Sequence, residues 1–238
     1  MTAEVSRNRR KALLRGMMFS APFLLVIVPF ALLFGVVATG AGLNIAQVMG
    51  FSLAVFAGAA QFSALQLMQE QAPTLVVLAT SLAVNLRMGM YSAALTPSLG
   101  ALPLGTRALV AFFLVDQSYA ASVVEFEKRP HLTPAERLAF FAGTVLPIAP
   151  AWYVATWVGA VVGTQIPPDY PLDFALPITF IAMIAPMLRS IPHLAAALVS
   201  VVGTLALSWM PYSTGVLVAA LAAMLTGAMV ELLIGKRA

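Results

Sequence analysis

The stretch that decides the fold is GMMFSAPFLLVIVPFALLFGVVATG at residues 16–40, which contains no charged residue. A transmembrane helix needs about 20 consecutive apolar residues, so this stretch is long enough to cross a bilayer. The residues before it, 1–15, carry five basic side chains. A basic segment ahead of an apolar core is also typical of a signal peptide, but this apolar run is too long and is followed by many similar ones. We interpret 16–40 as a first membrane span.

The composition of the whole chain also indicates a membrane protein. Of its 238 residues, 61% are hydrophobic and 9% are charged, whereas soluble domains carry about 25% charged residues. So few charges cannot cover a water-facing surface, which excludes a soluble enzyme and a nucleic-acid-binding protein. The chain has no cysteine and two histidines, and it contains neither a nucleotide-binding loop nor a zinc motif. We therefore expect no metal, no cofactor and no enzymatic activity.

Eight apolar stretches predict an all-α polytopic membrane protein in a lipid bilayer, because backbone groups in lipid must hydrogen-bond within a helix. The ten-residue alternation of a transmembrane barrel is missing. A re-entrant pair of short helices would mimic a span, so the pattern allows six to eight spans. The predicted spans are 16–40, 47–69, 74–95, 107–124, 138–163, 174–188, 194–210 and 213–234.

The basic residues predict that both termini are cytoplasmic, because cytoplasmic loops are enriched in Lys and Arg. With eight spans, the inner segments hold 11 of the 13 basic residues. The exceptions are Arg107, at an outer span end, and Arg87, within a span. The inner segment 125–137 also links two membrane halves, 16–124 and 138–238, of which the first carries most of the intramembrane polar residues. The predicted cytoplasmic segments are 1–15, 70–73, 125–137, 189–193 and 235–238.

Two opposite charges are predicted near the middle of the membrane. Arg87 is ten residues before Pro97, where its span ends, and Asp116 is nine residues after Arg107, where its span begins. At about 1.5 Å per residue, both lie roughly 15 Å deep, on helices expected to be antiparallel neighbours. One interpretation is an ion pair that serves packing alone. The other is a site for a zwitterion, where Arg87 binds a carboxylate and Asp116 binds an ammonium group or a proton.

Uncharged polar side chains extend this candidate site. Tyr91 is one turn after Arg87 and shares its face, whereas Asn85 faces the other way unless the helix is broken near Gly89. Gln61 lies on a small-residue face, which indicates either close helix packing or a polar group that needs a partner. The candidate residues for substrate binding or coupling are Gln61, Asn85, Arg87, Tyr91, Asp116 and Gln117.

Prolines and glycines predict helix breaks and close helix contacts. Broken helices in transporters expose backbone groups toward a central site. Gly159 and Gly163 form a GxxxG pair, which lets helices approach closely and predicts a face for a partner subunit. The candidate packing or break positions are Gly58, Gly89, Pro22, Pro29, Pro147, Pro150, Gly159 and Gly163.

Four stretches in order carry a resemblance to a known family. They are MMFSAPFLLVIVPFALLFGVVATGAG, FAGAAQFSALQLM, ATSLAVNLRMGMYSAAL and VDQSYA. Over roughly residues 16–120 the chain resembles the azaleucine-resistance (AzlC) family of branched-chain amino-acid permeases, with a weaker likeness in LDFALPITFIAMIAPML. The resemblance implies export of branched-chain amino acids, and sometimes of methionine, across the bacterial inner membrane. It also implies that this chain is the large subunit beside a small, separately encoded AzlD-type membrane subunit.

The leading functional prediction is therefore a secondary exporter of valine, leucine or isoleucine, driven by a proton or a substrate gradient. One alternative is a channel-like pore for a small polar solute, whose flux would not saturate and would not depend on pH. The other is a membrane scaffold that transports nothing. A scaffold has no need of Arg87 and Asp116 at the same depth in the membrane.

Overall fold

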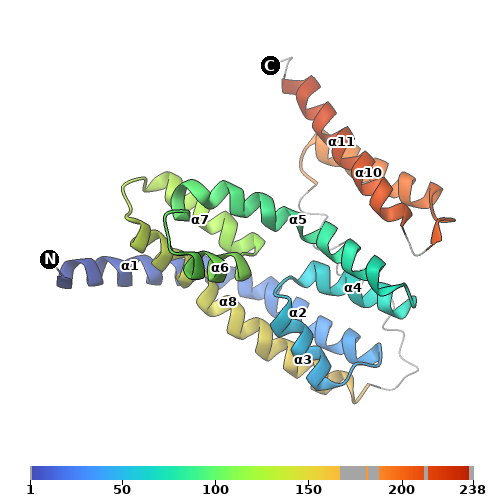
Figure 1. Cartoon of the computed structure of the whole chain (residues 1–238), viewed down its shortest axis with the longest axis horizontal. Helices are drawn as coiled ribbons and strands as arrows, with labels where there is room; N and C mark the ends of the chain where they lie inside the picture. Colours follow the sequence, from blue (N-terminus) through green and yellow to red (C-terminus); the bar gives the residue numbers. More distant parts are fainter. Residues whose placement is uncertain (1, 167–180, 182–187, 212–213, 236–238) are drawn as a thin grey trace. The chain divides into compact units, whose positions relative to one another are not determined.

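The computed structural model describes residues 2–166, 181, 188–211 and 214–235 (Figure 1). These residues form helices and no strand, which confirms the all-α prediction. The predicted span 174–188 lies outside the described residues except for positions 181 and 188. The helices are α1 (Thr2–Ser20), the 3-10 turn η1 (Ala21–Phe23), α2 (Leu24–Gly40), α3 (Ile45–Ala54), α4 (Gly58–Gln69), α5 (Thr74–Leu99), α6 (Leu104–Phe112), α7 (Asp116–Lys128), α8 (Pro134–Gly163), α10 (Ile191–Ala206) and α11 (Gly215–Gly235).

Four helical stretches in the described residues are long and apolar enough to cross a membrane, which makes the chain a polytopic membrane protein. They are Ser6–Gly40, Thr74–Leu99, Pro134–Gly163 and Gly215–Ile234. Pro22 lies in η1 between α1 and α2, whereas Pro29 lies inside α2. Pro147 and Pro150 lie inside α8 without ending it.

The chain divides into two compact units, each considered by itself. The first unit is Met1–Gln61 with Val84–Tyr170, and the second is Phe62–Ala83 with Pro171–Ala238. In the second unit α10 packs along α11 through small residues. A Cβ at Gly203 would meet Ala219, and a Cβ at Gly227 would meet Ala196.

In the first unit, α8 packs along both α1 and α2 through glycines. A Cβ added at Gly16 would collide with the backbone of Phe140, and one at Gly35 with the backbone of Thr156. Residue numbers increase in the same direction along the helices in contact, so α8 runs parallel to α1 and α2. Gly159 lies on the backbone of Leu32 in the same way. Small residues allow this approach of two backbones in a membrane.

Crowding at Gly159 predicts a loss of stability when a methyl group is added there. Glycine to alanine inside a helix normally stabilises it by up to about 1 kcal/mol, but overpacking costs about 1–3 kcal/mol. We expect Gly159→Ala to lower the melting temperature and the amount of inserted protein. Gly89→Ala is the matched control, because a Cβ at Gly89 meets nothing within 4 Å, and it should leave both values unchanged or slightly raised.

The predicted span 107–124 is not one helix but a hairpin of two short ones. α6 ends at Phe112, residues 113–115 are not helical, and α7 begins at Asp116. α7 runs back to the end of the unit where α1 begins. Glu125, near the end of α7, accepts a hydrogen bond from Arg15 of α1 at 2.9 Å. The hydroxyl of Ser118 bonds the unwound backbone by accepting from the Val115 N–H at 2.9 Å. We call the end where α1 begins the basic end.

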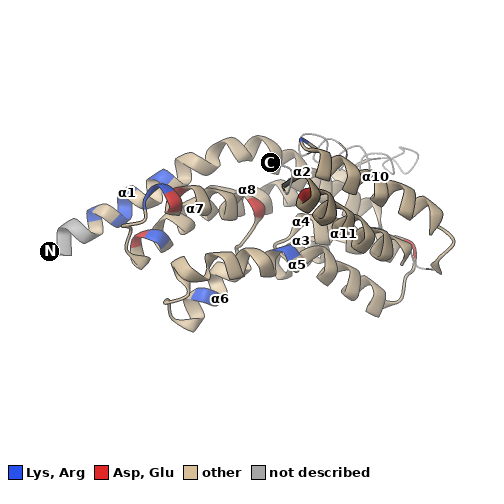
Figure 2. Cartoon of the chain, turned by 90° about the horizontal axis from the view of Figure 1, so that it is seen from above, with Lys and Arg blue, Asp and Glu red and all other residues tan. Residues whose placement is uncertain are grey.

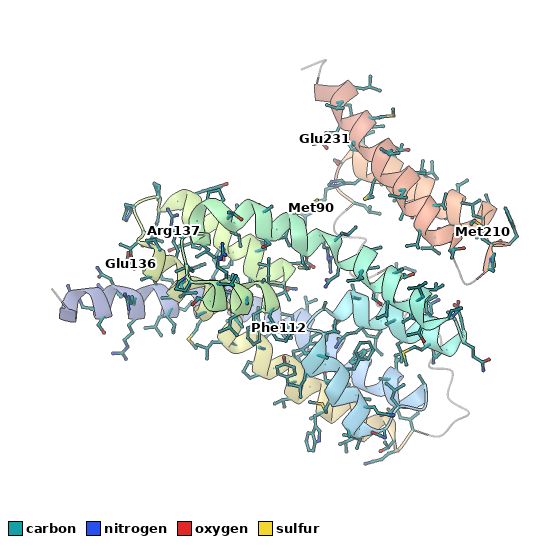
Figure 3. The ribbon with its side chains drawn as sticks, in the orientation of Figure 1. Met90, Phe112, Glu136, Arg137, Met210 and Glu231 are labelled. Carbon is teal, nitrogen blue, oxygen red and sulfur yellow. The ribbon has the colours of Figure 1, made fainter. Side chains whose placement is uncertain are left out.

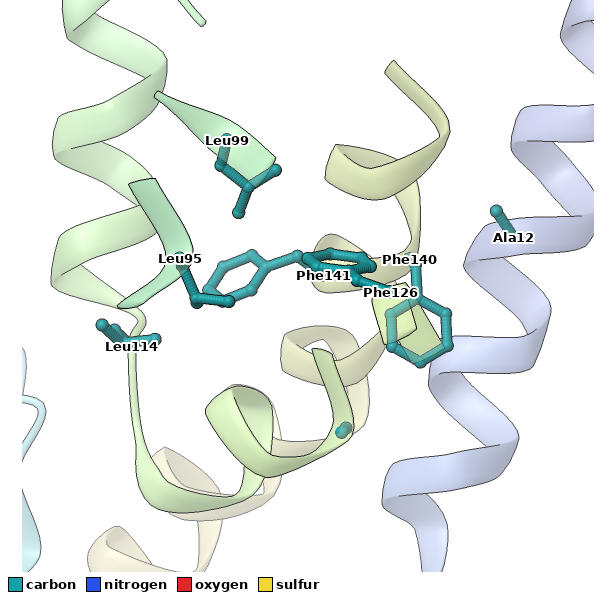
Figure 4. Packing of buried hydrophobic residues seen from close by; sticks show 8 residues of the cluster. Ala12, Leu95, Leu99, Leu114, Phe126, Phe140 and Phe141 are labelled. Atoms are coloured by element: carbon teal, nitrogen blue, oxygen red, sulfur yellow. The ribbon is translucent and has the colours of Figure 1, made fainter. Parts of the chain in front are cut away.

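The direction of α5 determines the end of the unit at which the α6–α7 hairpin begins. Leu95 and Leu99, near the end of α5, pack in one apolar core with Ala12 of α1 and with Phe140 and Phe141 of α8 (Figure 4). The last turns of α5 therefore lie at the basic end, and α6 starts there. α5 runs antiparallel to α1 and α8, and the α6–α7 hairpin enters and leaves on the same side.

The predicted span 47–69 is also broken, at residues 55–57 between α3 and α4. The side chain of Gln61 donates to the hydroxyl of Ser52 at 3.2 Å, although nine residues of straight helix would separate them by about 14 Å. The chain therefore folds back at the break. α4 then leads through residues 70–73 to the start of α5. The predictions of single helices over 47–69 and 107–124 are both wrong.

The hairpins change the side of the membrane that is predicted for Arg107. With eight full spans Arg107 would be an outer residue, but α6 begins at the basic end and carries Arg107 in its first turns. In the first unit, every basic residue other than Arg87 now lies at one end, and Figure 2 shows basic positions on α1, beside α7 and on α6, with a further one on α5. The positive-inside rule predicts that this end is cytoplasmic.

Ion pairs hold the basic end together. Glu125 accepts bonds from Arg15 of α1 at 2.9 Å and from Arg129 at 3.3 Å. Arg137 of α8 donates to the carbonyl of Pro130 at 2.9 Å. α8 itself starts with a capping box, in which Thr133 and Glu136 bond each other's backbone N–H, a pattern that satisfies the open donors of a helix N-terminus.

Candidate functional site

The centre of the candidate site is an ion pair between Arg87 and Asp116. The Arg87 Nη1 and Asp116 Oδ2 atoms are 3.0 Å apart. Arg87 lies near the middle of α5, and Asp116 is the first residue of α7, directly after the unwound tip of the α6–α7 hairpin. A carboxylate is favourable at that position because the first turn of a helix carries partial positive charge. The tip thus places a carboxylate beside the middle of α5.

Two tyrosines continue the ion pair along the same helices. Tyr91 is one turn after Arg87, Tyr119 is one turn after Asp116, and their rings stack with centroids 4.0 Å apart and planes inclined by 8°. Equal steps along both helices mean that α5 and α7 are parallel here, which corrects the expected antiparallel arrangement. Tyr91 therefore lies on the same face of α5 as Arg87, and it interacts more strongly with Asp116 than with Arg87.

Each side chain of the ion pair keeps one polar atom open, which here means without a hydrogen-bond partner among the described residues. These atoms are Arg87 Nε and Asp116 Oδ1, and both are buried. Buried polar atoms are nearly always bonded, and those that are not need an explanation. The open donor of Arg87 suits a carboxylate oxygen, and the open acceptor of Asp116 suits an ammonium group or a proton. The arrangement has the chemistry to hold a small zwitterion.

Three other predicted residues are placed differently. Gln61 is fully buried and bonds Ser52, rather than Asn85 as considered from the sequence. Asn85 and Gln117 are half-buried and make no hydrogen bond with another described residue. α5 runs unbroken through Gly89, so the break that would have turned Asn85 toward Arg87 is absent.

The two hairpin tips meet at a cluster of aromatic rings that sequence analysis missed. Phe56, in the unwound segment of α3–α4, has its ring centroid 6.4 Å from that of Phe112 and 5.6 Å from that of Phe113. Phe112 is the last residue of α6 (Figure 3). Phe56 also contacts Trp152 and Tyr153 of α8, with ring centroids 6.3 and 5.7 Å away. We call these five residues the aromatic junction.

A pocket of about 310 Å³ lies between α5 and α6, at the small end of the range for ligand sites. Its lining runs from Gly100 and Arg107 at the basic end to Leu114, two residues before Asp116. Most of its other lining residues are apolar, including Leu95 and Leu99. The pocket therefore leads from the basic end toward the hairpin tip that carries Asp116.

The glycine pair proposed from the sequence as a partner face is occupied within the chain. Gly159 packs on Leu32, and Gly163 packs on Val36 and Thr39 of α2. This face of α8 is therefore covered by α2 and cannot receive a second subunit.

Comparison with known proteins finds similarity over the part of the chain that contains the site. A family model described as AzlC protein matches residues 22–166. An uncharacterized membrane protein of Archaeoglobus fulgidus is 29% identical over 213 residues, covering 87% of this chain and 90% of the relative. The inner membrane protein YgaZ of Escherichia coli is 25% identical over 177 residues, covering 72% and 71%. No solved structure matches.

Proposed function

The chain belongs to the AzlC family, and from this premise we propose that it exports valine, leucine and isoleucine, with methionine as a further substrate. Family membership and the apolar helices support a role in membrane transport. The substrates, the direction and a place in the bacterial inner membrane are the proposal. A secondary mechanism fits a chain that contains no nucleotide-binding loop.

The observation that carries the proposal is the Arg87–Asp116 pair with its open Nε and Oδ1 atoms. An amino acid bears one carboxylate and one ammonium group, and each finds a partner of opposite charge here. Arginine holds carboxylates through directed hydrogen bonds. The adjacent pocket between α5 and α6 is lined by leucines and is suited to an aliphatic side chain. Its position supports entry from the basic end, as export requires.

Asp116 gives the site a means of coupling. Protonation of Asp116 would remove its charge, weaken its attraction to Arg87 and leave that guanidinium available to a substrate carboxylate. Ionisable groups inside membranes commonly serve as proton relays. This supports proton coupling over a simple substrate gradient in the proposed mechanism.

We also propose a small AzlD-type membrane subunit as the partner. The α8 glycine face is already covered, so the partner would bind elsewhere on the chain. Co-purification of the two chains, and export that rises when both are present, are the expected results. Full export by this chain alone would contradict the partner proposal but leave the substrate proposal intact.

The function is tested with everted membrane vesicles, in which an exporter moves solute inward. We expect vesicles containing this chain and its partner to accumulate labelled leucine with saturable kinetics, in competition with valine and isoleucine. A proton gradient should change the rate. Vesicles without the chain are the control. Flux that rises linearly with leucine and ignores pH would indicate a channel, and no flux would indicate a scaffold.

A further inference from the structure

A second pair of unsatisfied polar groups lies beside the other hairpin tip. Gln61 is in the first turn of α4 and is fully buried, and while its Nε2 donates to Ser52, its Oε1 has no partner among the described residues. Trp152 of α8 is 6% exposed, and its Nε1–H also has no partner there. Each such group costs free energy in a folded protein unless something binds it.

Both groups belong to side chains that lie at the first turn of α4. A Cβ at Gly58, the first residue of α4, would lie 2.7 Å from the Cη2 atom of Trp152 and 2.6 Å from Phe30, so the six-membered ring of the indole lies against this turn. Gln61 is three residues further on, which is the same face of a helix. An open acceptor and an open donor thus belong to two side chains at the start of a half-helix, where the backbone dipole favours negative charge.

The aromatic junction includes Trp152 and reaches the tip of the α6–α7 hairpin, which carries Asp116. Phe56 contacts Trp152 and also Phe112 and Phe113, and Phe113 is three residues before Asp116. Phe56 is therefore in contact with aromatic rings from both the α6–α7 tip and α8.

We propose that Gln61 and Trp152 form a second binding site for the transported amino acid, in addition to the Arg87–Asp116 site. The Trp152 N–H and the start of α4 bind the carboxylate, and Gln61 Oε1 accepts from the ammonium group. This inference rests on the proposed function, because it takes the same zwitterion as ligand. It assigns a role to Trp152, and to Phe56 as the ring that contacts the neighbourhoods of both sites.

Trp152→Phe is the first test, because it removes the N–H and keeps an aromatic ring. We expect leucine export per inserted molecule to fall about tenfold, the factor that corresponds to one lost hydrogen bond to a charged group. Trp157→Phe is the matched control, on the same helix but 52% exposed, and should export normally. Gln61→Met should act like Trp152→Phe, whereas Gln66→Met, at an exposed position of the same helix, should not.

A binding measurement separates this inference from the proposed function. In a variant carrying Trp157→Phe and Trp209→Phe, Trp152 is the remaining tryptophan of the three in the chain. Its fluorescence should change and saturate as leucine is added, and this response should disappear with Gln61→Met and persist with Asp116→Asn. Suppose that the wild type exports leucine, the Trp152→Phe variant exports at the same rate, and the fluorescence of Trp152 stays constant. This result overturns the second site alone and leaves the proposed function intact. If wild type transports no amino acid, the proposed function fails, and a constant fluorescence then overturns the inference as well.

Discussion

A cysteine introduced in place of Glu70 should react only with reagents outside the cell, and one in place of Ala101 only from the cytoplasm. Both positions are exposed and lie in turns at the two ends of α5. Eight full spans place the segment with residue 70 inside and the segment with residue 101 outside, which is the opposite result for each. For both positions, the hairpin arrangement predicts labelling by a membrane-impermeant maleimide from the side opposite to the one that eight full spans predict.

The measurement has a clean background because the native chain contains no cysteine. Ser6→Cys is the matched control, since it lies ahead of the first span and is cytoplasmic in either arrangement. Labelling of residue 70 from the inside together with residue 101 from the outside would show that 47–69 and 107–124 cross the membrane. It would then also place Arg107 back on the outer side.

The sequence predicts the fold class well because hydropathy depends on composition, which a hairpin hardly alters. A re-entrant pair of half-helices is as apolar as one full span, so 47–69 and 107–124 both have the length and hydropathy of a transmembrane helix. What distinguishes them is local. Residues 55–57 and 113–115 are unwound, and neither segment contains a proline to mark the break. Arg107 was the available indication, because it violates the positive-inside rule with eight spans and obeys it with hairpins.

The sequence predicts that Arg87 and Asp116 lie close together, but the structure brings them together by a different geometry. Counting residues from the span ends placed Arg87 and Asp116 at equal depth. In the structure they meet because the tip of the α6–α7 hairpin reaches the middle of α5, with α7 parallel to it. Trp152 and Phe56 were missed because aromatic residues in an apolar stretch carry no periodic pattern. Only the two tips, once folded, bring them together.

The Arg87–Asp116 pair is where a single substitution should have the largest effect on transport. Asp116→Asn keeps the shape of the side chain but removes the charge that binds ammonium or a proton. We expect leucine export per inserted molecule to fall at least about 100-fold, equivalent to about 2.7 kcal/mol. The unpaired Arg87 should also lower the amount of inserted protein. Breaking a fully buried pair costs about 3–5 kcal/mol, and the cost here should be smaller because the two side chains are 35% and 43% exposed.

The double variant Arg87→Gln with Asp116→Asn distinguishes packing from function. Replacing both partners of an ion pair is often tolerated, so we expect insertion to recover toward the wild-type amount. If the pair holds substrate or protons, export stays at least about 100-fold down. The matched control is Arg15→Gln with Glu125→Gln, which removes an ion pair of similar length at the basic end and should leave export per molecule unchanged. Normal export by the Arg87 and Asp116 double variant would mean that neither residue binds the solute or a coupling proton, and that the pair serves only to join α5 to the tip of the α6–α7 hairpin.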